Sequence, residues 1–312
     1  MGPWSRSPMT PTTSIETGLE NADLAALKAA IDADLIKSLP NQSPIAQPLV
    51  DAMRYAVLGG GKRMRPMLLR AACHSCGGKP EHAVAASIAI ECIHAYSLVH
   101  DDLPAMDNDA IRHGKPANHI EFGEATAIIA GDGLQTFAFQ LLAGDQTNSS
   151  SQRSALVAEL AQASGWQGMA GGQCMDMNSE GRALSLEELK SLHAAKTGAL
   201  IQGALTMGAI CADKSAATPE YQLMRQTGRT IGLAFQVMDD VLDATASTSV
   251  LGKPAGSDVL NHKSTFVTLM GVDEAKQYAE TLLEAGLKAL TASALQTRTL
   301  EALARKAVRR DH

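Results

Sequence analysis

A ten-residue stretch, HDDLPAMDND at positions 100–109, places four aspartates within nine residues. The run before it, Val84–His100, holds a single acid and is apolar on nearly every side, which is typical of a helix buried all round. Pro104 stops that helix. Asp101 and Asp102 therefore fall in its last turn, where the helix dipole disfavours negative charge. A compensating cation is expected, and a solvated acidic patch is the alternative.

A second stretch, TIGLAFQVMDDVLD (Thr230–Asp243), repeats this arrangement. Asp239 and Asp243 are four residues apart and share one helix face, where like charges cost about a few tenths of a kcal/mol without a cation between them. Mg²⁺ suits such sites, since it takes one or two carboxylates and completes its shell with water and substrate phosphate. Two such clusters predict a cleft with metal on both walls.

A third stretch, GGGKRMRP (Gly59–Pro66), supplies positive charge behind flexible glycines, and a new helix is expected after its proline. Lys62 and Arg65 suit phosphate oxygens as a point charge and a forked donor. The stretch lacks the GxxxxGK[ST] pattern of a nucleotide P-loop. A basic pocket separate from two metal-ready walls implies two phosphate-bearing substrates.

Composition limits the class of protein. The chain has 312 residues, 45% of them hydrophobic, and a net charge of −6. No basic stripe for nucleic acid is present. The uncharged segment Thr197–Ala212 is too short for the roughly 20 apolar residues that span a bilayer. Five cysteines, an odd number, predict reduced thiols in the cytoplasm, with Cys73 and Cys76 packed between helices rather than forming a metal or redox site.

The elements that must position these residues are predicted to be helices throughout. Helical apolar spacing recurs in Leu24–Ile36 and Leu186–Ile201, and convincing period-two strand patterns are absent. Ser185 and Glu188 form a capping box at one helix start. We therefore expect one all-α domain at 23–312, after a disordered tail at 1–22 that has a short transit peptide as its alternative.

The motif order GGGKRMRP, ECIHAYSLVHDDLPAMDND, GGQCMD, KTGALI, FQVMDDVLD, LGK, over about residues 24 to 270, resembles the trans-isoprenyl diphosphate synthases. Within that family it is most similar to the bacterial type of farnesyl diphosphate synthase. The resemblance implies a homodimer of all-α subunits with the isoprenoid synthase fold, whose helices surround a central cavity. It also implies Mg²⁺-dependent condensation of isopentenyl diphosphate with allylic diphosphates (dimethylallyl and geranyl) to make farnesyl diphosphate.

Roles follow from the resemblance, position by position. Three Mg²⁺ ions, replaceable by Mn²⁺, are expected on Asp101, Asp107 and Asp239, with Asp102 and Asp243 in support. The allylic diphosphate is expected to meet Arg112, Lys196 and Lys253, and the oxygens of Thr197 and Gln236 are expected to face the allylic cation. Isopentenyl diphosphate is expected on Lys62, Arg65 and His94. Gln173 and Asp176 of GGQCMD line the site or brace a helix, and Lys263 lies at the cavity mouth.

Some residues carry different expectations. Arg63 is expected to be solvated, and His100 to pack rather than to bind metal. Relatives usually carry two arginines where this chain has Arg112 and His113, so affinity for isopentenyl diphosphate is put in question, and Asn108 replaces a common acid. Tyr96 and Ser97 precede Asp101 by five and four residues, so a growing chain is expected to meet them below the aspartates. Tyr96 together with the longer aspartate motif resembles the farnesyl makers, which implies a product of C15.

Three alternatives remain open. Geranyl or geranylgeranyl diphosphate synthesis is the alternative within the same chemistry. A non-catalytic partner subunit would tend to lose an aspartate cluster, and a terpene cyclase has no use for Lys62 and Arg65. We expect a cytoplasmic enzyme that neither binds nucleic acid nor inserts stably into a membrane.

Overall fold

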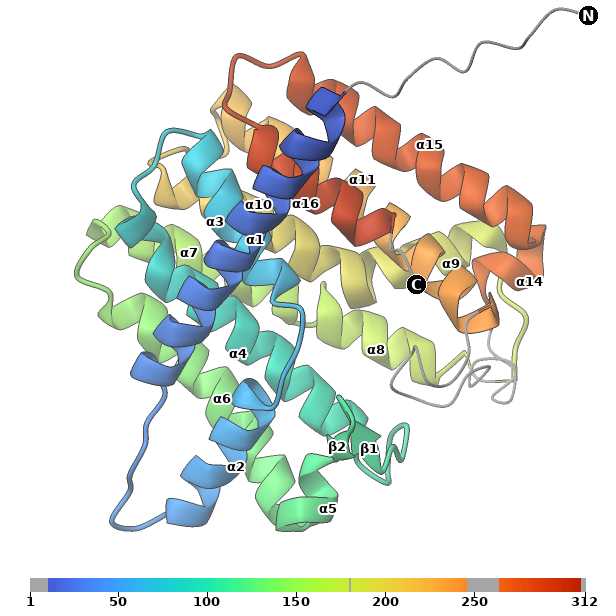
Figure 1. The fold of residues 1–312 in the computed structure, drawn as a ribbon. Coiled ribbons are helices and arrows are strands. Elements are labelled where there is room, and N and C mark those ends of the chain that lie inside the picture. Colours follow the sequence, from blue (N-terminus) through green and yellow to red (C-terminus); the bar gives the residue numbers. More distant parts are fainter. Residues whose placement is uncertain (1–10, 180, 246–263, 310–312) are drawn as a thin grey trace, which may run out of the picture.

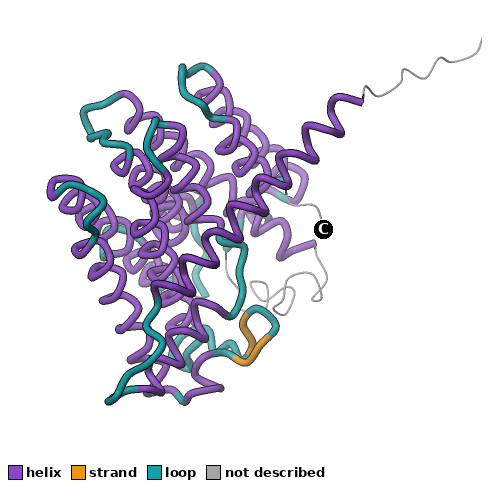
Figure 2. Tube along the Cα trace, turned by 60° about the vertical axis from the view of Figure 1, so that its left-hand side comes forward, coloured by secondary structure: helices purple, strands orange, loops and turns teal. Residues whose placement is uncertain are grey.

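The structure is a computed structural model that describes residues 11–179, 181–245 and 264–309. Helices make up most of this part of the chain (Figures 1 and 2). The longer α-helices are α1 (Pro11–Ser38), α2 (Gln47–Leu58), α3 (Met64–Ser75), α4 (Val84–Asp101), α6 (Glu124–Gly144), α7 (Ser150–Ser164), α10 (Ala199–Cys211), α11 (Pro219–Thr245), α15 (Val272–Thr291) and α16 (Arg298–Val308). Shorter helices are η1 (Pro80–Ala83), α5 (Asn118–Phe122), α8 (Met169–Met177), α9 (Leu186–His193), η2 (Ala194–Gly198) and α14 (Phe266–Met270). The all-α prediction is confirmed.

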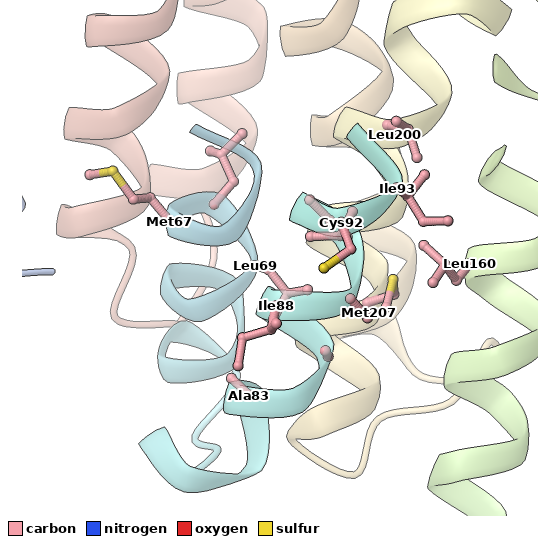
Figure 3. Packing of buried hydrophobic residues seen from close by; sticks show 14 of the residues in the cluster. Met67, Leu69, Ala83, Ile88, Cys92, Ile93, Leu160, Leu200 and Met207 are labelled. Carbon is pink, nitrogen blue, oxygen red and sulfur yellow. The ribbon is translucent and has the colours of Figure 1, made fainter. Parts of the chain in front are cut away.

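The core lies where α3, α4, α7 and α10 meet, and α4 runs through its middle. Ile88, Cys92 and Ile93 of α4 are fully buried and lie between Leu69 of α3 and Leu160 of α7 (Figure 3). An apolar helix is stable here because protein covers it on every side, as its sequence predicted. The segment Pro80–Asp101 has the length and hydropathy of a membrane span, and 67% of an 18-residue stretch within it is buried inside the protein. Packing within the core therefore accounts for its apolar character.

Sequence and structure agree on the start of α9 and on the state of two cysteines. The capping box of Ser185 and Glu188 is present at the start of α9. Cys73 and Cys76 are buried free thiols, and burial raises the pKa of Cys73 to about 12 and of Cys76 to about 11. Both thiols are therefore protonated packing groups, as expected.

Two features differ from the sequence expectation. α1 begins at Pro11, inside the 1–22 segment expected to be disordered; residues 1–10 lie outside the described residues, and the domain boundary stays a prediction. α3 begins at Met64, two residues before Pro66, because proline is tolerated in a first helical turn where its missing N–H has no partner to lose.

A short antiparallel hairpin was missed altogether. β1 (Ile111–Arg112) pairs with β2 (Lys115–Pro116) and lies at the end of α4. His113 and Gly114 form its turn with φ of 52° and 75°, the left-handed pair that two-residue hairpin turns require. Strands of two residues leave no periodic pattern, so only Gly114 signalled the turn.

Candidate active site

The first aspartate group is made by a loop that folds back on α4. The backbone N–H of Asp107 donates to the carbonyl of Asp101 at 2.9 Å, and the N–H of Asn108 donates to the carbonyl of Leu103 at 3.1 Å. Asn108 has a φ of 54°, which asparagine tolerates better than most residues. The loop therefore returns Asp107 to the last turn of α4, beside Asp101.

Asp101 shows the electrostatic consequence of this arrangement. The pKa of its carboxyl is raised to about 6, chiefly by burial; Lys196 and Arg112 lower it, and the charges of Asp107 and Asp102 add to the rise. An anionic carboxylate here is thus under-compensated by the protein's own charges. Lys196 lowers the pKa of Asp101, so the end of α4 lies near η2, which comes from a distant part of the sequence.

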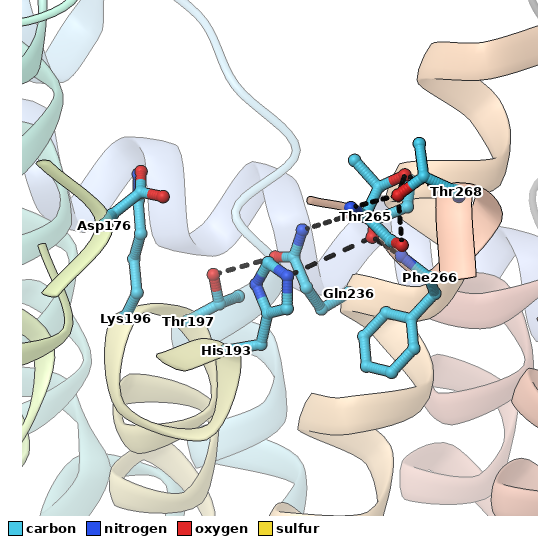
Figure 4. Close-up of polar contacts among 9 residues, drawn as sticks. Asp176, His193, Lys196, Thr197, Gln236, Thr265, Phe266 and Thr268 are labelled. Atoms are coloured by element: carbon cyan, nitrogen blue, oxygen red, sulfur yellow. Dashed lines mark hydrogen bonds and ion pairs between the residues drawn. The ribbon is translucent and has the colours of Figure 1, made fainter. Parts of the chain in front are cut away.

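The opposite wall is built on η2, a single π-helical turn that carries Lys196 and Thr197 between α9 and α10. Lys196 Nζ lies 2.5 Å from Asp176 Oδ2 of α8 (Figure 4). The sequence left Asp176 between lining the site and bracing a helix. In the structure Asp176 forms an ion pair with Lys196. The π-helical turn that carries Lys196 is of a kind that is frequent at functional sites.

Glycines let two helices approach η2 backbone to backbone. A methyl group added to Gly172 of α8 would lie 2.1 Å from the backbone nitrogen of Lys196. One added to Gly232 of α11 would lie 3.0 Å from the Cα of Gly198. Both distances are too short for a side chain to fit without a shift, so these glycines set how closely α8 and α11 surround Lys196 and Thr197.

α11 brings the second aspartate group to this wall. Asp239 is partly buried, whereas Asp240 and Asp243 are buried, at 4% and 6% exposure. Gln236, one turn earlier, accepts a hydrogen bond from the Thr197 hydroxyl at 2.9 Å. The structure therefore joins the two residues that the family resemblance assigned to the allylic cation.

Arg63 corrects an expectation. It was expected to be solvated, but this residue of the GGGKRMRP loop is only 6% exposed. Its guanidinium donates to Asp32 of α1, Glu91 of α4 and the carbonyl of Val57, each at 2.8 Å. Arg63 has a φ of 53°, a conformation these three bonds must hold. The loop is therefore anchored by a buried cation.

Basic residues gather beside this anchored loop. Desolvation lowers the pKa of His94 well below its usual value, and the charges of Arg65, His113, Arg112 and Arg63 lower it further. Desolvation, then Arg112, Arg63 and Lys62, lowers the pKa of His113. Both histidines are therefore neutral at pH 7. Lys62, Arg65, Arg112 and the two histidines are thus near enough to influence one another, and an anion would complement their charge.

Arg112 takes a more constrained position than expected. It contacts Asp102 through both Nε and Nη2, and its Nη2 lies 3.2 Å from Asp109. Asp102 is 1% exposed. Its carboxylate therefore orients Arg112, while its support of a metal ion stays a prediction.

The comparisons with known proteins bear on this geometry. The family model for polyprenyl synthetase matches residues 46–302. The chain belongs to the polyprenyl synthetase family. It is 44% identical over 282 residues to farnesyl diphosphate synthase of Escherichia coli (strain K12), covering 88% of this chain and 93% of that one. It is 44% identical over 250 residues to the chloroplastic geranylgeranyl pyrophosphate synthase of Capsicum annuum, covering 79% and 67%.

A solved structure extends the comparison. The geranyltransferase of Helicobacter pylori, complexed with magnesium and isoprenyl diphosphate, superposes with a TM-score of 0.82 at 30% identity, covering 97% of this chain and 98% of that one. Like other members of the polyprenyl synthetase family, this protein is a prenyltransferase.

Within this prenyltransferase, Gln173 of α8 is a notable polar group. Both polar atoms of its side chain are buried and, within the described residues, neither makes a hydrogen bond. Buried amides in native proteins nearly always have partners. The observation favours the interpretation that Gln173 lines the site over the interpretation that it braces a helix. Lys253 and Lys263 lie outside the described residues, and their expected roles stay predictions.

The residues below Asp101 were expected to limit chain length. Tyr96 is 8% exposed and packs edge-on against His100 at 5.7 Å. His100 Nε2 in turn lies 3.0 Å from the carbonyl of Ile128, so His100 is a packing residue, as expected. Ser97 donates to the carbonyl of His94 at 2.9 Å and offers little bulk.

Sequence reasoning missed two residues that organise the site. Asp240 accepts hydrogen bonds from both Gln236 and the backbone N–H of Phe266. His193, one residue before η2, stacks on the Phe266 ring at 5.6 Å (Figure 4). A second aspartate in DDVLD was visible in the sequence, but nothing local distinguished its role from that of Asp239.

Proposed function

We propose that this prenyltransferase is a farnesyl diphosphate synthase that condenses isopentenyl diphosphate with dimethylallyl and geranyl diphosphates. One observation carries the proposal: Lys196 and Thr197 of η2 are held by Asp176 and Gln236, near enough to Asp101 for Lys196 to lower the pKa of its carboxyl. The basic residues near His94 supply further positive charge for a second diphosphate. The bacterial relative's activity agrees with this assignment.

The donors at the first site fit magnesium. Asp101, Asp107 and Asp239 offer hard carboxylate oxygens, and Asp101 lacks full charge compensation. Across the described ranges, no three His, Cys, Asp or Glu side chains lie close enough together to hold a metal ion by themselves. An ion that completes its shell with substrate phosphate suits such an open set. The proposal includes three Mg²⁺ ions per site, which Mn²⁺ can replace. Asp102 and Asp243 are proposed to support the metal-binding carboxylates. When bound, Mg²⁺ neutralises charge on the leaving diphosphate.

The chain's own residues account for the remaining chemistry. The C–O bond of the allylic diphosphate breaks, and both electrons leave with diphosphate, whose charge Lys196 and Arg112 stabilise. The oxygens of Thr197 and Gln236 face the resulting cation. The double bond of isopentenyl diphosphate then attacks this cation to form the new C–C bond, which leaves a tertiary cation on the isopentenyl unit. The adjacent carbon loses a proton to the released diphosphate, and the electrons of that C–H bond form the new double bond. No protein nucleophile is required, and exclusion of water protects the cations from quenching.

Isopentenyl diphosphate is assigned to Lys62, Arg65, His94 and His113, with Gln173 as a further contact. We expect His113→Arg to lower the KM for isopentenyl diphosphate several-fold and to leave the KM for geranyl diphosphate nearly unchanged. The reason is that neutral His113 lies among phosphate-binding residues and arginine adds a permanent charge there. Steady-state kinetics with each substrate varied in turn measure both constants.

His113→Gln is the matched control, since it stays neutral and is expected to leave the KM for isopentenyl diphosphate within about threefold, well under one tenfold step of 1.4 kcal/mol. An unchanged KM in His113→Arg would mean that the side chain points away from that substrate.

Product length is assigned to Tyr96. We expect Tyr96→Ala to shift products from C15 to C20 and longer, because each condensation moves the tail five carbons further down α4 until a bulky side chain stops it. At 1.5 Å per residue, Tyr96 lies about 7 Å below Asp101. Chromatographic analysis of the hydrolysed products gives the chain length.

Tyr96→Phe is the matched control, because it removes only the hydroxyl and keeps the bulk of the ring. It is expected to keep C15 products. If a folded, active Tyr96→Ala enzyme also made only C15, chain length would be set elsewhere.

The enzyme is further proposed to be a cytoplasmic homodimer that inserts into no membrane and binds no nucleic acid. Ile120 of α5 and Ile128 and Ile129 of α6 are 56%, 44% and 52% exposed and support a contact surface on these helices. Light scattering coupled to size exclusion reports the assembly state, and a monomeric active enzyme would contradict this part.

Incubation with Mg²⁺, isopentenyl diphosphate and each allylic diphosphate in turn tests the central proposal. Farnesyl diphosphate is the expected end product from dimethylallyl and geranyl diphosphates. Accumulation of C10 or C20 would favour the geranyl or geranylgeranyl alternative, and the second of these is the activity named for the Capsicum annuum relative. Absence of condensation would leave the non-catalytic subunit.

A further inference from the structure

A directed set of hydrogen bonds connects Thr197 to the start of α14. The Thr197 hydroxyl donates to Gln236 Oε1 at 2.9 Å, Gln236 Nε2 donates to Asp240 Oδ1 at 3.0 Å, and the N–H of Phe266 donates to Asp240 Oδ2 at 2.8 Å. Figure 4 shows Gln236 between Thr197 and the Thr265–Thr268 segment. The bonds therefore span from η2 through α11 to α14.

The direction of each bond is fixed by Asp240. A carboxylate has no proton to donate, so it can only accept from Gln236. The NH₂ end of the Gln236 amide must then face Asp240, and its oxygen must face Thr197. Because the Thr197 proton is used on that oxygen, the lone pairs of Thr197 and one lone pair of Gln236 remain available to a third group.

Asp240 is itself held in place. It is 4% exposed, and the N–H that it accepts belongs to the first residue of α14, which begins with a capping box between Thr265 and Thr268. The ring of Phe266 is fully buried and stacks on His193, which precedes η2. The carboxylate is thus fixed from α14, and α14 is fixed against η2.

We propose that Asp240 is a positioning residue that sets the orientation of the Gln236 amide, so that carbonyl oxygen, and not NH₂, faces the allylic cation. This inference rests on the proposed function. Asp240 contacts no substrate in this role and differs from Asp239 and Asp243, which are assigned to metal. A fixed negative dipole end lowers the energy of a cation without reorganisation, whereas an NH₂ group at the same place raises it.

Asp240→Asn tests the orientation. The backbone N–H of Phe266 still requires an acceptor, so the introduced asparagine turns its oxygen there and its NH₂ toward Gln236. Gln236 must then reverse, presenting oxygen to the new amide and NH₂ to Thr197 and the cation. We expect kcat to fall about 100-fold, the scale of misplacing one preorganised dipole, while the KM of each substrate changes little.

The double variant Asp240→Asn/Gln236→Glu restores the original polarity. A carboxylate at 236 accepts from the asparagine NH₂ on one side and from Thr197 on the other, and it returns oxygen to the cation. We expect kcat of the double variant to exceed that of Asp240→Asn by at least about tenfold, because one misplaced dipole is expected to lower kcat by about 100-fold. A double variant no faster than the single one overturns the proposal.

Binding of a cation mimic gives a readout that a purely structural role would not move. Two inert analogues are compared: an allylic diphosphate analogue with a tertiary ammonium at the cationic carbon, and its uncharged carbon counterpart. The wild-type enzyme is expected to bind the ammonium analogue more tightly than the uncharged one. In Asp240→Asn the ratio of the two affinities is expected to fall about tenfold, a change of about 1.4 kcal/mol. The double variant is expected to restore the ratio. Equal preference in all three enzymes overturns the proposal.

Two controls complete the design. If Asp240→Asn does not fold by circular dichroism, the double variant is compared with Gln236→Leu, which has no oxygen to present; the double variant alone is expected to prefer the ammonium analogue, and equal preference overturns the inference. Turnover by the wild-type enzyme is measured first. A wild-type enzyme without condensation activity refutes the proposed function, whereas an active wild type with unaffected variants refutes only the role of Asp240.

Discussion

Asp101→Ala and Asp239→Ala are each expected to lower kcat by several orders of magnitude while leaving the helical fold intact. The two carboxylates are assigned to opposite walls of the same diphosphate site, and the charge they help neutralise develops mainly as the C–O bond breaks. An interaction realised in the transition state lowers kcat and kcat/KM together when it is lost. Single-turnover assays at saturating Mg²⁺ measure the chemical step, and circular dichroism reports the fold.

Asp51→Ala is a suitable control, because this carboxylate on α2 is exposed and accepts a hydrogen bond from Gln47 of the same helix. It is expected to leave kcat unchanged. Near-normal turnover in either Asp101→Ala or Asp239→Ala would sink the metal-bridge interpretation. The magnitudes of the two losses should also be similar, since each variant removes one wall of one site.

Arg63→Ala is expected to lower the free energy of unfolding by about 3–5 kcal/mol, the usual loss when one partner of a buried ion pair is removed. Glu91, with a side chain 5% exposed, would be left as an uncompensated buried charge. Urea denaturation followed by circular dichroism measures the change.

Two variants sharpen this experiment. Lys28→Ala removes the other cation on Asp32, but Lys28 is 42% exposed, so a loss below about 1 kcal/mol is expected. Arg63→Met/Glu91→Leu removes both buried charges and is expected to recover most of the stability. A loss in Arg63→Ala no larger than that in Lys28→Ala would show that the anchor contributes little.

The sequence predicted those parts of the site whose cause is local. An apolar run such as Val84–His100 has to be a buried helix, and carboxylates at its end have to be compensated wherever the rest of the chain lies. The capping box at Ser185 is likewise complete within four residues. The order of six motifs then indicated the family, because each motif is a short stretch of sequence whose residues serve the same reaction.

Only the tertiary structure decided the residues whose partners are distant. Arg63 was misjudged because burial of its charge depends on Asp32 and Glu91, which are 31 and 28 residues away. The Asp240 contact with Phe266 spans 26 residues. Whether a charged side chain is solvated, braces a loop or orients a neighbour depends on which hydrogen-bond partners folding brings to it. That information lies in the packing of helices, and the local pattern around either residue does not contain it.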